Sequence, residues 1–116
     1  MNEPEIYFFD CIDRNAIVIK PKKPFFEWLN NIEPEGSTFT VDEANIYLVR
    51  ERDSNDQIER WLSRNFDRIF QNELNGWYLD QSLWPQKRTY KIFKEWFDFE
   101  IHSMILDIEN TAVSKL

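Results

Sequence analysis

A short segment near the end of the chain places two carboxylates and the sequence's single histidine at alternate positions. Asp98, Glu100 and His102 alternate with apolar residues that begin at Phe97 and continue to Ile105. A period of two is typical of a strand with one buried face. On such a strand the three polar side chains share one face, with neighbours roughly 7 Å apart. This row is therefore the first candidate for chemistry.

Two chemical roles fit the row. Two carboxylate oxygens and one imidazole could bind a divalent metal ion. Alternatively, Glu100 could raise the proton affinity of His102 for general acid-base catalysis. Either role needs a further ligand or acid from elsewhere, for which Asp80 is a candidate, and the same alternation also describes the solvated face of a sheet. A small hydrolytic or metal-dependent enzyme using Asp98, Glu100 and His102 is thus the alternative function, with no catalytic or metal residue assigned.

A second candidate site is a ring-rich segment that lacks helical or strand periodicity. It holds Trp77, Tyr78 and Trp84, with Asp80 between them. Rings on a loop commonly anchor a protein interface or line a pocket. They can also fold back as a lid over the core, with Pro85 fixing the entry to the next helix. These four residues are the binding candidates of this segment.

A third candidate is a row of three arginines on an expected helix. Arg60, Arg64 and Arg68 lie four residues apart and share its outer face. Three guanidinium groups in a row could contact phosphates, with Arg64 at the centre, as a nucleic-acid accessory protein would require. Acidic side chains lie within one turn, at positions 56, 59 and 67. A solvated face of ion pairs is therefore the competing interpretation.

The amino-acid composition limits which kinds of partner the protein can bind. Fourteen basic and 21 acidic side chains give a net charge of −7, which removes any general attraction to nucleic acid or anionic lipid. A local basic patch would be needed, and the lysine-rich stretches 20–23 and 87–94 would supply one if they met in the fold. At 42% hydrophobic and 16% aromatic, the chain has enough apolar material for a packed core.

The sequence lacks features that are typical of several common classes of protein. Cys11 is the only cysteine, which excludes an intrachain disulfide, and no neighbouring cation activates it. The sequence has no nucleophile elbow, Walker loop or dinucleotide fingerprint, and we expect no cofactor. Residues 1–5 are acidic and unlike a signal peptide, and the apolar runs are too short to span a bilayer. We expect a soluble, cytoplasmic protein without membrane contact.

The elements that position these residues follow from periodicity and capping. The expected order is a strand at 15–20, a helix at 24–32, a strand at 46–49, a helix at 55–74, a helix that begins after Thr89, and the alternating strand, which we expect to run to about 107. The long helix has the strongest signal, because Ser54 and Gln57 form a capping box and Gly76 supplies a left-handed stop.

The pattern predicts one α+β domain in the order β-α-β-α-α-β. Its sheet has about three strands, mainly antiparallel, covered on one face by three helices. We expect the core to span about 15–108 of the single domain 1–116, with frayed ends at 1–5 and 109–116. Residues 6–9 could add an edge strand or cover the core, and the strand order is left open.

Two stretches of the sequence resemble a known group of proteins. These stretches are Ile19–Leu29 and the run from Glu73 to Met104, which includes Gly76-Trp77-Tyr78, Ser82-Leu83-Trp84-Pro85 and Glu100-Ile101-His102. They resemble a group of short bacterial proteins of uncharacterised function over residues 15–108. The resemblance implies a free-standing bacterial protein and transfers no activity or ligand.

These observations together favour a protein-binding module, with a protein partner or self-association. The main reason is that 19 aromatic residues are many for a chain of this size, so some rings should remain partly exposed.

Overall fold

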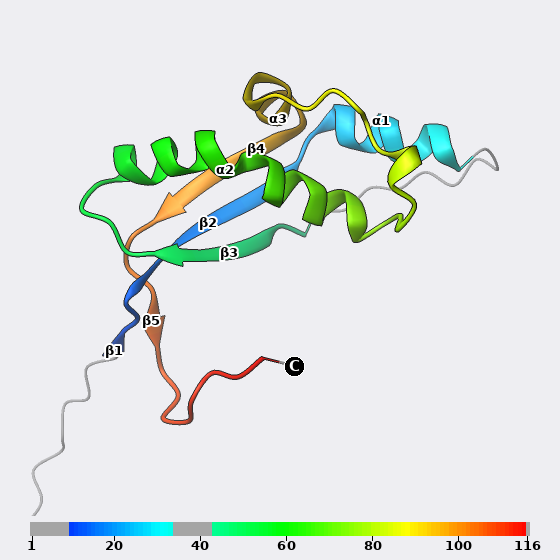
Figure 1. Cartoon of the computed structure of the whole chain (residues 1–116). Coiled ribbons are helices and arrows are strands. Elements are labelled where there is room, and N and C mark those ends of the chain that lie inside the picture. Colours follow the sequence, from blue (N-terminus) through cyan, green and yellow to red (C-terminus); the bar gives the residue numbers. More distant parts are fainter. Residues whose placement is uncertain (1–9, 34–42, 116) are drawn as a thin grey trace, which may run out of the picture.

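The computed structural model describes residues 10–33 and 43–115, and within them a three-stranded antiparallel sheet forms the centre of the fold (Figure 1). The strands are β2 (Arg14–Pro21), β3 (Asn45–Arg50) and β4 (Phe97–His102), in the order β3-β2-β4. The expected α+β class and element order are confirmed. The expectation for residues 6–9 lies outside the described residues.

The central strand β2 forms because its sequence suits a strand that is buried. Ile17, Val18 and Ile19 are β-branched, and Ile17 and Ile19 are fully buried. Ile17 lies opposite Tyr47 of β3 and Ile101 of β4, which places all three on the covered face. Pro21 ends the strand because it cannot donate a ladder hydrogen bond.

All of the helices lie on one face of this sheet (Figure 1). They are α1 (Lys23–Ile32), α2 (Asn55–Asn75) and α3 (Tyr90–Trp96), with a short 3-10 turn at Gln81–Leu83 (η1). The core between helices and sheet is rich in rings. Its largest fully buried side chains include Phe25, Phe70, Phe93 and Phe97. Phe70 packs against Phe97 with ring centres 5.4 Å apart, which joins α2 to β4.

Only the N-terminus of α2 forms as the sequence predicts. The Ser54 hydroxyl accepts the Gln57 backbone N–H at 3.3 Å, while the Gln57 side chain accepts the Asp53 N–H at 3.2 Å. The expected left-handed stop at Gly76 is wrong, because this residue is right-handed (φ −64°, ψ −19°). The helix ends instead as Trp77 and Tyr78 donate to the Leu74 carbonyl.

The last strand is interrupted, so the expectation of one strand to about 107 is wrong. β4 ends at His102, and β5 (Leu106–Asp107) pairs with β1 (Asp10–Cys11) in a separate two-stranded arm. From the pair Cys11↔Leu106 to the pair Ala16↔His102, the N-terminal segment advances by five residues and the C-terminal segment by four. The extra residue breaks the ladder as a bulge does. Ile105 consequently lies outside the core that Phe97, Phe99 and Ile101 complete.

Candidate functional site

The polar row of β4 lies on the sheet face that the helices leave open. Asp98, Glu100 and His102 are all exposed. The Lys22 ammonium lies 3.8 Å from Asp98, and His102 Nε2 lies 3.2 Å from Glu100 Oε2. No group of three His, Cys, Asp or Glu side chains in the described part of the chain could hold a metal ion. In this arrangement the row makes one exposed ion pair, between Lys22 and Asp98, and one exposed hydrogen-bonding contact, between His102 and Glu100.

The ring-rich segment packs mostly as a lid over the core. Trp84 is buried, and its Nε1 donates to the Tyr78 carbonyl at 2.9 Å. The Tyr78 hydroxyl donates to Glu33 Oε1 at 2.8 Å, and its ring meets Trp28 edge to face at 5.7 Å. Trp77 remains exposed at the surface.

Asp80 has a local structural role in the same segment. Its carboxylate accepts the Ser82 hydroxyl at 2.7 Å and the Ser82 backbone N–H at 3.0 Å, and it caps η1. The hydrogen bond from the Ser82 side chain lowers the pKa of Asp80. Because Trp84 belongs to the core and the polar row alternates with core-facing residues, the two candidates lie on opposite sides of the sheet. Asp80 therefore does not join His102.

The two lysine-rich stretches do meet. The Lys22 ammonium, at the start of α1, donates to the Lys94 carbonyl of α3 at 3.1 Å. The Lys94 ammonium in turn lies 4.7 Å from the centre of the Tyr90 ring. The contact with Asp98 partly balances this charge.

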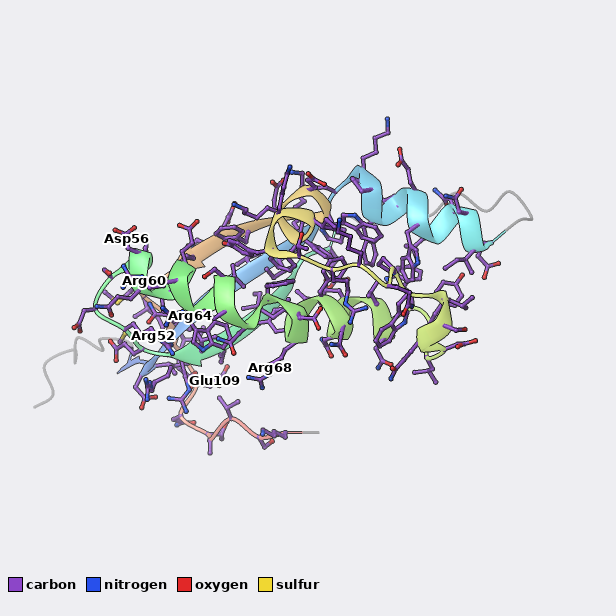
Figure 2. All side chains as sticks on the ribbon, turned by 45° about the horizontal axis from the view of Figure 1, so that its top comes forward. Arg52, Asp56, Arg60, Arg64, Arg68 and Glu109 are labelled. Carbon is purple, nitrogen blue, oxygen red and sulfur yellow. The ribbon has the colours of Figure 1, made fainter. Side chains whose placement is uncertain are left out.

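The arginine row is not neutralised in the way its neighbours suggest. Within the described residues, no carboxylate lies within 4 Å of the Arg60, Arg64 or Arg68 guanidinium. Asp67 pairs instead with Arg88, with Nε and Oδ1 2.7 Å apart, and this contact lowers the pKa of Asp67. The row therefore presents three cations without a close ion pair, and Figure 2 shows Arg52, Asp56 and Glu109 in the same area of the view.

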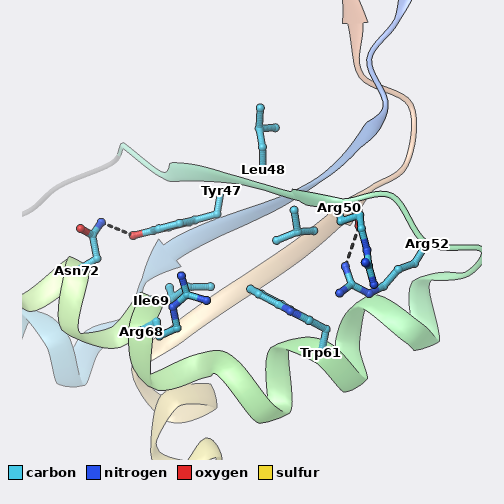
Figure 3. A pocket seen from close by; sticks show the side chains of 9 residues that line it. Tyr47, Leu48, Arg50, Arg52, Trp61, Arg68, Ile69 and Asn72 are labelled. Carbon is cyan, nitrogen blue, oxygen red and sulfur yellow. Dashed lines mark hydrogen bonds between the residues drawn. The ribbon is translucent and has the colours of Figure 1, made fainter. Parts of the chain in front are cut away.

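A groove between β3 and α2 collects these charges (Figure 3). It has a volume of about 700 Å³ and continues into a second hollow of about 360 Å³ beside Arg60 and Arg64. Five of the seven arginines in the sequence line the two hollows: Arg50, Arg52, Arg60, Arg64 and Arg68. No carboxylate or lysine is among the lining residues of either hollow. In an acidic chain, this is a concentrated cationic site.

The end of the groove at Arg52 is held in place. The backbone N–H of Arg52 donates to the Asn15 side chain at 2.9 Å, and Asn15 is only 1% exposed. The Arg52 guanidinium donates to the Arg50 carbonyl at 2.8 Å and lies 5.6 Å from the centre of the Trp61 ring. Hydrogen bonding and cation-π attraction thus orient this cation before any ligand arrives.

The opposite end is fixed by a buried carboxylate. Glu73 of α2 is 5% exposed, and its Oε2 accepts the Tyr47 hydroxyl at 2.5 Å and the Asn45 side chain at 2.6 Å. The Asn72 side chain donates to the same Tyr47 hydroxyl at 2.9 Å. Burial, and then the hydrogen bond to Glu73, raise the pKa of Tyr47. This network joins β3 to α2 at this end of the groove.

The backbone of β3 borders the groove with N–H and C=O groups that no other strand of the described residues pairs with. Lys22 N–H donates to the Trp96 carbonyl, and antiparallel pairs alternate between bonded and non-bonded. By this alternation the even-numbered residues of β2 bond to β4, and its odd-numbered residues bond to the odd-numbered residues of β3. The backbone N–H and C=O groups of Ile46, Leu48 and Arg50 therefore point towards the free edge. Among the described residues, the one hydrogen bond to these groups is that of Arg52 to Arg50.

Side chains of β3 extend the apolar surface onto the open face of the sheet. Ile46 and Leu48 are 65% and 52% exposed there, beside Ala16 and Val18 of β2. On the groove side, Trp61 and Ile69 line the hollow. A strand added to β3 would therefore meet apolar residues on both of its faces.

Of the sequence candidates, only the arginine row contributes to this groove. The sequence analysis singles out neither Trp61 nor the two arginines Arg50 and Arg52, because these arginines lie outside any periodic pattern. The spacing of Trp61, Arg64 and Arg68 is a signal for Trp61 alone, since it places a partly exposed ring beside cations on one helix edge.

Comparisons with known proteins add no assignment. Scans against protein-family models, curated proteins and solved structures each found no match to this chain. Within residues 10–33 and 43–115, no helix combines the length and apolar composition that crossing a bilayer requires.

Proposed function

We propose that this chain is a protein-interaction module that binds an extended, acidic segment of a partner protein in the groove between β3 and α2. The observation that supports this most directly is a set of five arginines around a groove along the edge of β3: among the described residues, these arginines have no carboxylate partner and this edge has no paired strand. The expected bacterial origin and cytoplasmic location belong to the same proposal.

The charges favour an acidic ligand. Arginine donates a planar fork of hydrogen bonds that matches carboxylate, and it holds its charge at every relevant pH. Because the chain as a whole is acidic, a carboxylate-bearing segment is attracted at the groove and repelled elsewhere.

The strand edge favours a polypeptide. An extended segment that pairs with β3 would satisfy the N–H and C=O groups of Ile46 and Leu48, which is the mode known as strand addition. Its alternate side chains would enter the groove towards Trp61 and Ile69. A single-stranded nucleic acid could use the arginines and stack on Trp61, but it has no use for the strand edge.

Fluorescence anisotropy tests the proposal directly. The probe is a labelled peptide Glu-Ile-Asp-Val-Glu-Phe-Asp-Ile, compared with the same peptide carrying lysine at each acidic position and with labelled single-stranded oligothymidine. We expect binding of the acidic peptide alone, weakening as salt rises.

A double charge reversal locates the site. Arg64→Glu with Arg68→Glu should weaken peptide binding at least tenfold, because two contacts each worth about 0.5–1 kcal/mol become repulsive. Lys91→Glu, an exposed reversal on α3, is the matched control and should change the affinity less than twofold. Binding of oligothymidine but not of the acidic peptide, or no peptide binding at 100 µM protein, refutes the proposal.

A further inference from the structure

The sequence itself contains a segment with the chemistry that the groove requires. Residues 3–9 read Glu-Pro-Glu-Ile-Tyr-Phe-Phe, with two carboxylates and no cation. Four large residues with high strand propensity, Ile6 to Phe9, follow the acids. Residues 1–9 lie outside the described part of the chain.

We propose that residues 3–9 of a second copy of this chain pair with the free edge of β3, and that two copies exchange these segments to form a dimer. This inference rests on the proposed function, since it names the partner of the same groove. It goes beyond that function by assigning a specific occupant.

Apolar complementarity supports the assignment. A strand whose side chains are apolar on one face only would leave either the groove or the open face uncovered. Ile6 and Phe8 project to one side of an extended segment, and Tyr7 and Phe9 to the other. One pair can therefore enter the groove beside Trp61, while the other covers the exposed Ile46 and Leu48.

Charge complementarity supports it as well. Glu3 and Glu5 precede the apolar run, so carboxylates lie at one end of the strand. Arginines lie at both ends of the groove, with Arg50 and Arg52 at one end and Arg68 towards the other (Figure 3). Either strand direction brings acids next to guanidinium groups.

The length of the segment favours a second copy over the same chain. β1 begins at Asp10, in the arm beyond the end of β3 (Figure 1). To return to the level of Ala16, opposite Leu48, the same chain would retrace six residues, or about 20 Å. Residues 3–9 span only about 23 Å when extended, so almost none of this segment would remain for pairing with β3 of its own chain. A segment from another copy has no such restriction.

Exchange also explains how the assembly would close. When each copy donates its segment to the other, the two contacts are related by a twofold axis and no edge of β3 is left for a third copy. Such a dimer conceals the strand edge that would otherwise risk uncontrolled pairing.

Sedimentation equilibrium of the full chain from 1 to 200 µM is the first test, and we expect a monomer-dimer equilibrium. Phe8→Lys should raise the dimer dissociation constant at least tenfold, as should Leu48→Lys in the groove edge. Two matched controls add the same charge elsewhere: Asn2→Lys just before the segment, and Leu79→Lys at an exposed leucine of the ring-rich loop. Both should change the constant less than threefold, and circular dichroism checks that each variant is folded.

Mixing the variants tests exchange itself. Phe8→Lys retains an intact groove and Leu48→Lys retains an intact segment, so a mixture should form a heterodimer through one restored contact, more tightly than either variant alone. Failure of the mixture to associate, with both variants folded, overturns the exchange.

The remaining outcomes separate this inference from the proposed function. A chain that stays monomeric to 200 µM but binds the foreign acidic peptide overturns the inference and leaves the function intact. If that monomer binds the peptide more tightly after Phe8→Lys, the segment occupies its own groove, and the exchange is again overturned. A dimer unaffected by Phe8→Lys uses another surface. The absence of both dimer and peptide binding refutes both proposals.

Discussion

Replacing Tyr47 with phenylalanine should lower stability by an amount that depends on pH. The change removes the hydroxyl that donates to the buried Glu73 carboxylate and accepts from Asn72. A hydrogen bond to a charged group contributes about 1.5–3 kcal/mol, and Asn45 alone is left to satisfy Glu73. For 116 residues we expect a fall in Tm of about 4 °C per kcal/mol, or about 6–12 °C at pH 8.

At alkaline pH the cost of Tyr47→Phe should shrink. The pKa of Tyr47 is raised above its ordinary value of 10 in the folded protein, so the unfolded chain releases this proton first as the pH rises. The wild type therefore loses stability above pH 10, while the variant has no such proton to lose. At pH 11 the difference between the two should be smaller by at most about 1.4 kcal/mol.

Urea unfolding followed by tryptophan fluorescence at pH 8 and at pH 11 measures this difference. The other tyrosines titrate in both proteins, so their contribution cancels. Glu73→Gln in a double-mutant cycle with Tyr47→Phe should show a coupling energy of about 1 kcal/mol or more. A cost that is the same at both pH values, or below about 0.5 kcal/mol at pH 8, would refute the account of the network given above.

Three further changes have defined outcomes. Gly76→Ala should raise the free energy of unfolding by about 0.4–1 kcal/mol, because the residue is right-handed and a Cβ would meet the Glu73 carbonyl at an ordinary 3.5 Å; a lower Tm would contradict this. Arg88 lowers the pKa of Asp67, so the Asp67 carboxylate contributes stability near neutral pH that is lost as the pH falls below 3.8. The urea midpoints of the wild type and of Asp67→Asn should therefore converge in that range. A constant gap between the two midpoints would contradict the pairing. His102→Ala should change stability by less than about 1 kcal/mol in thermal melts, because its contact is exposed, and a larger loss would mean that the open sheet face is covered.

Local signals in the sequence predicted most of the fold. The capping box of Ser54 and Gln57 and the alternation of Phe97 to His102 each involve residues within a few positions, and both are found as expected. The break after His102 was not predictable, because it depends on an extra residue in the paired segment near Cys11, which is distant in the sequence.

The candidate site was less predictable for the same reason. Counting neighbours along the helix assigned Asp67 to the arginine row, but the fold brings it to Arg88, 21 positions away. The groove needs β3 and α2 side by side, which no pattern within either segment specifies. The sequence indicates Arg64 as a candidate, but it does not indicate the edge of β3 beside which the arginines lie.

The position of β2 at the centre of the sheet also constrains how the protein is made. β2 is synthesised early, yet one of its two partners, β4, comes so late that Ala16 pairs with His102, 86 positions further on. Until those last residues leave the ribosome, one edge of an apolar strand has no native partner. Sheet closure therefore has to wait until β4 has been synthesised, and contacts of such long range favour slow folding.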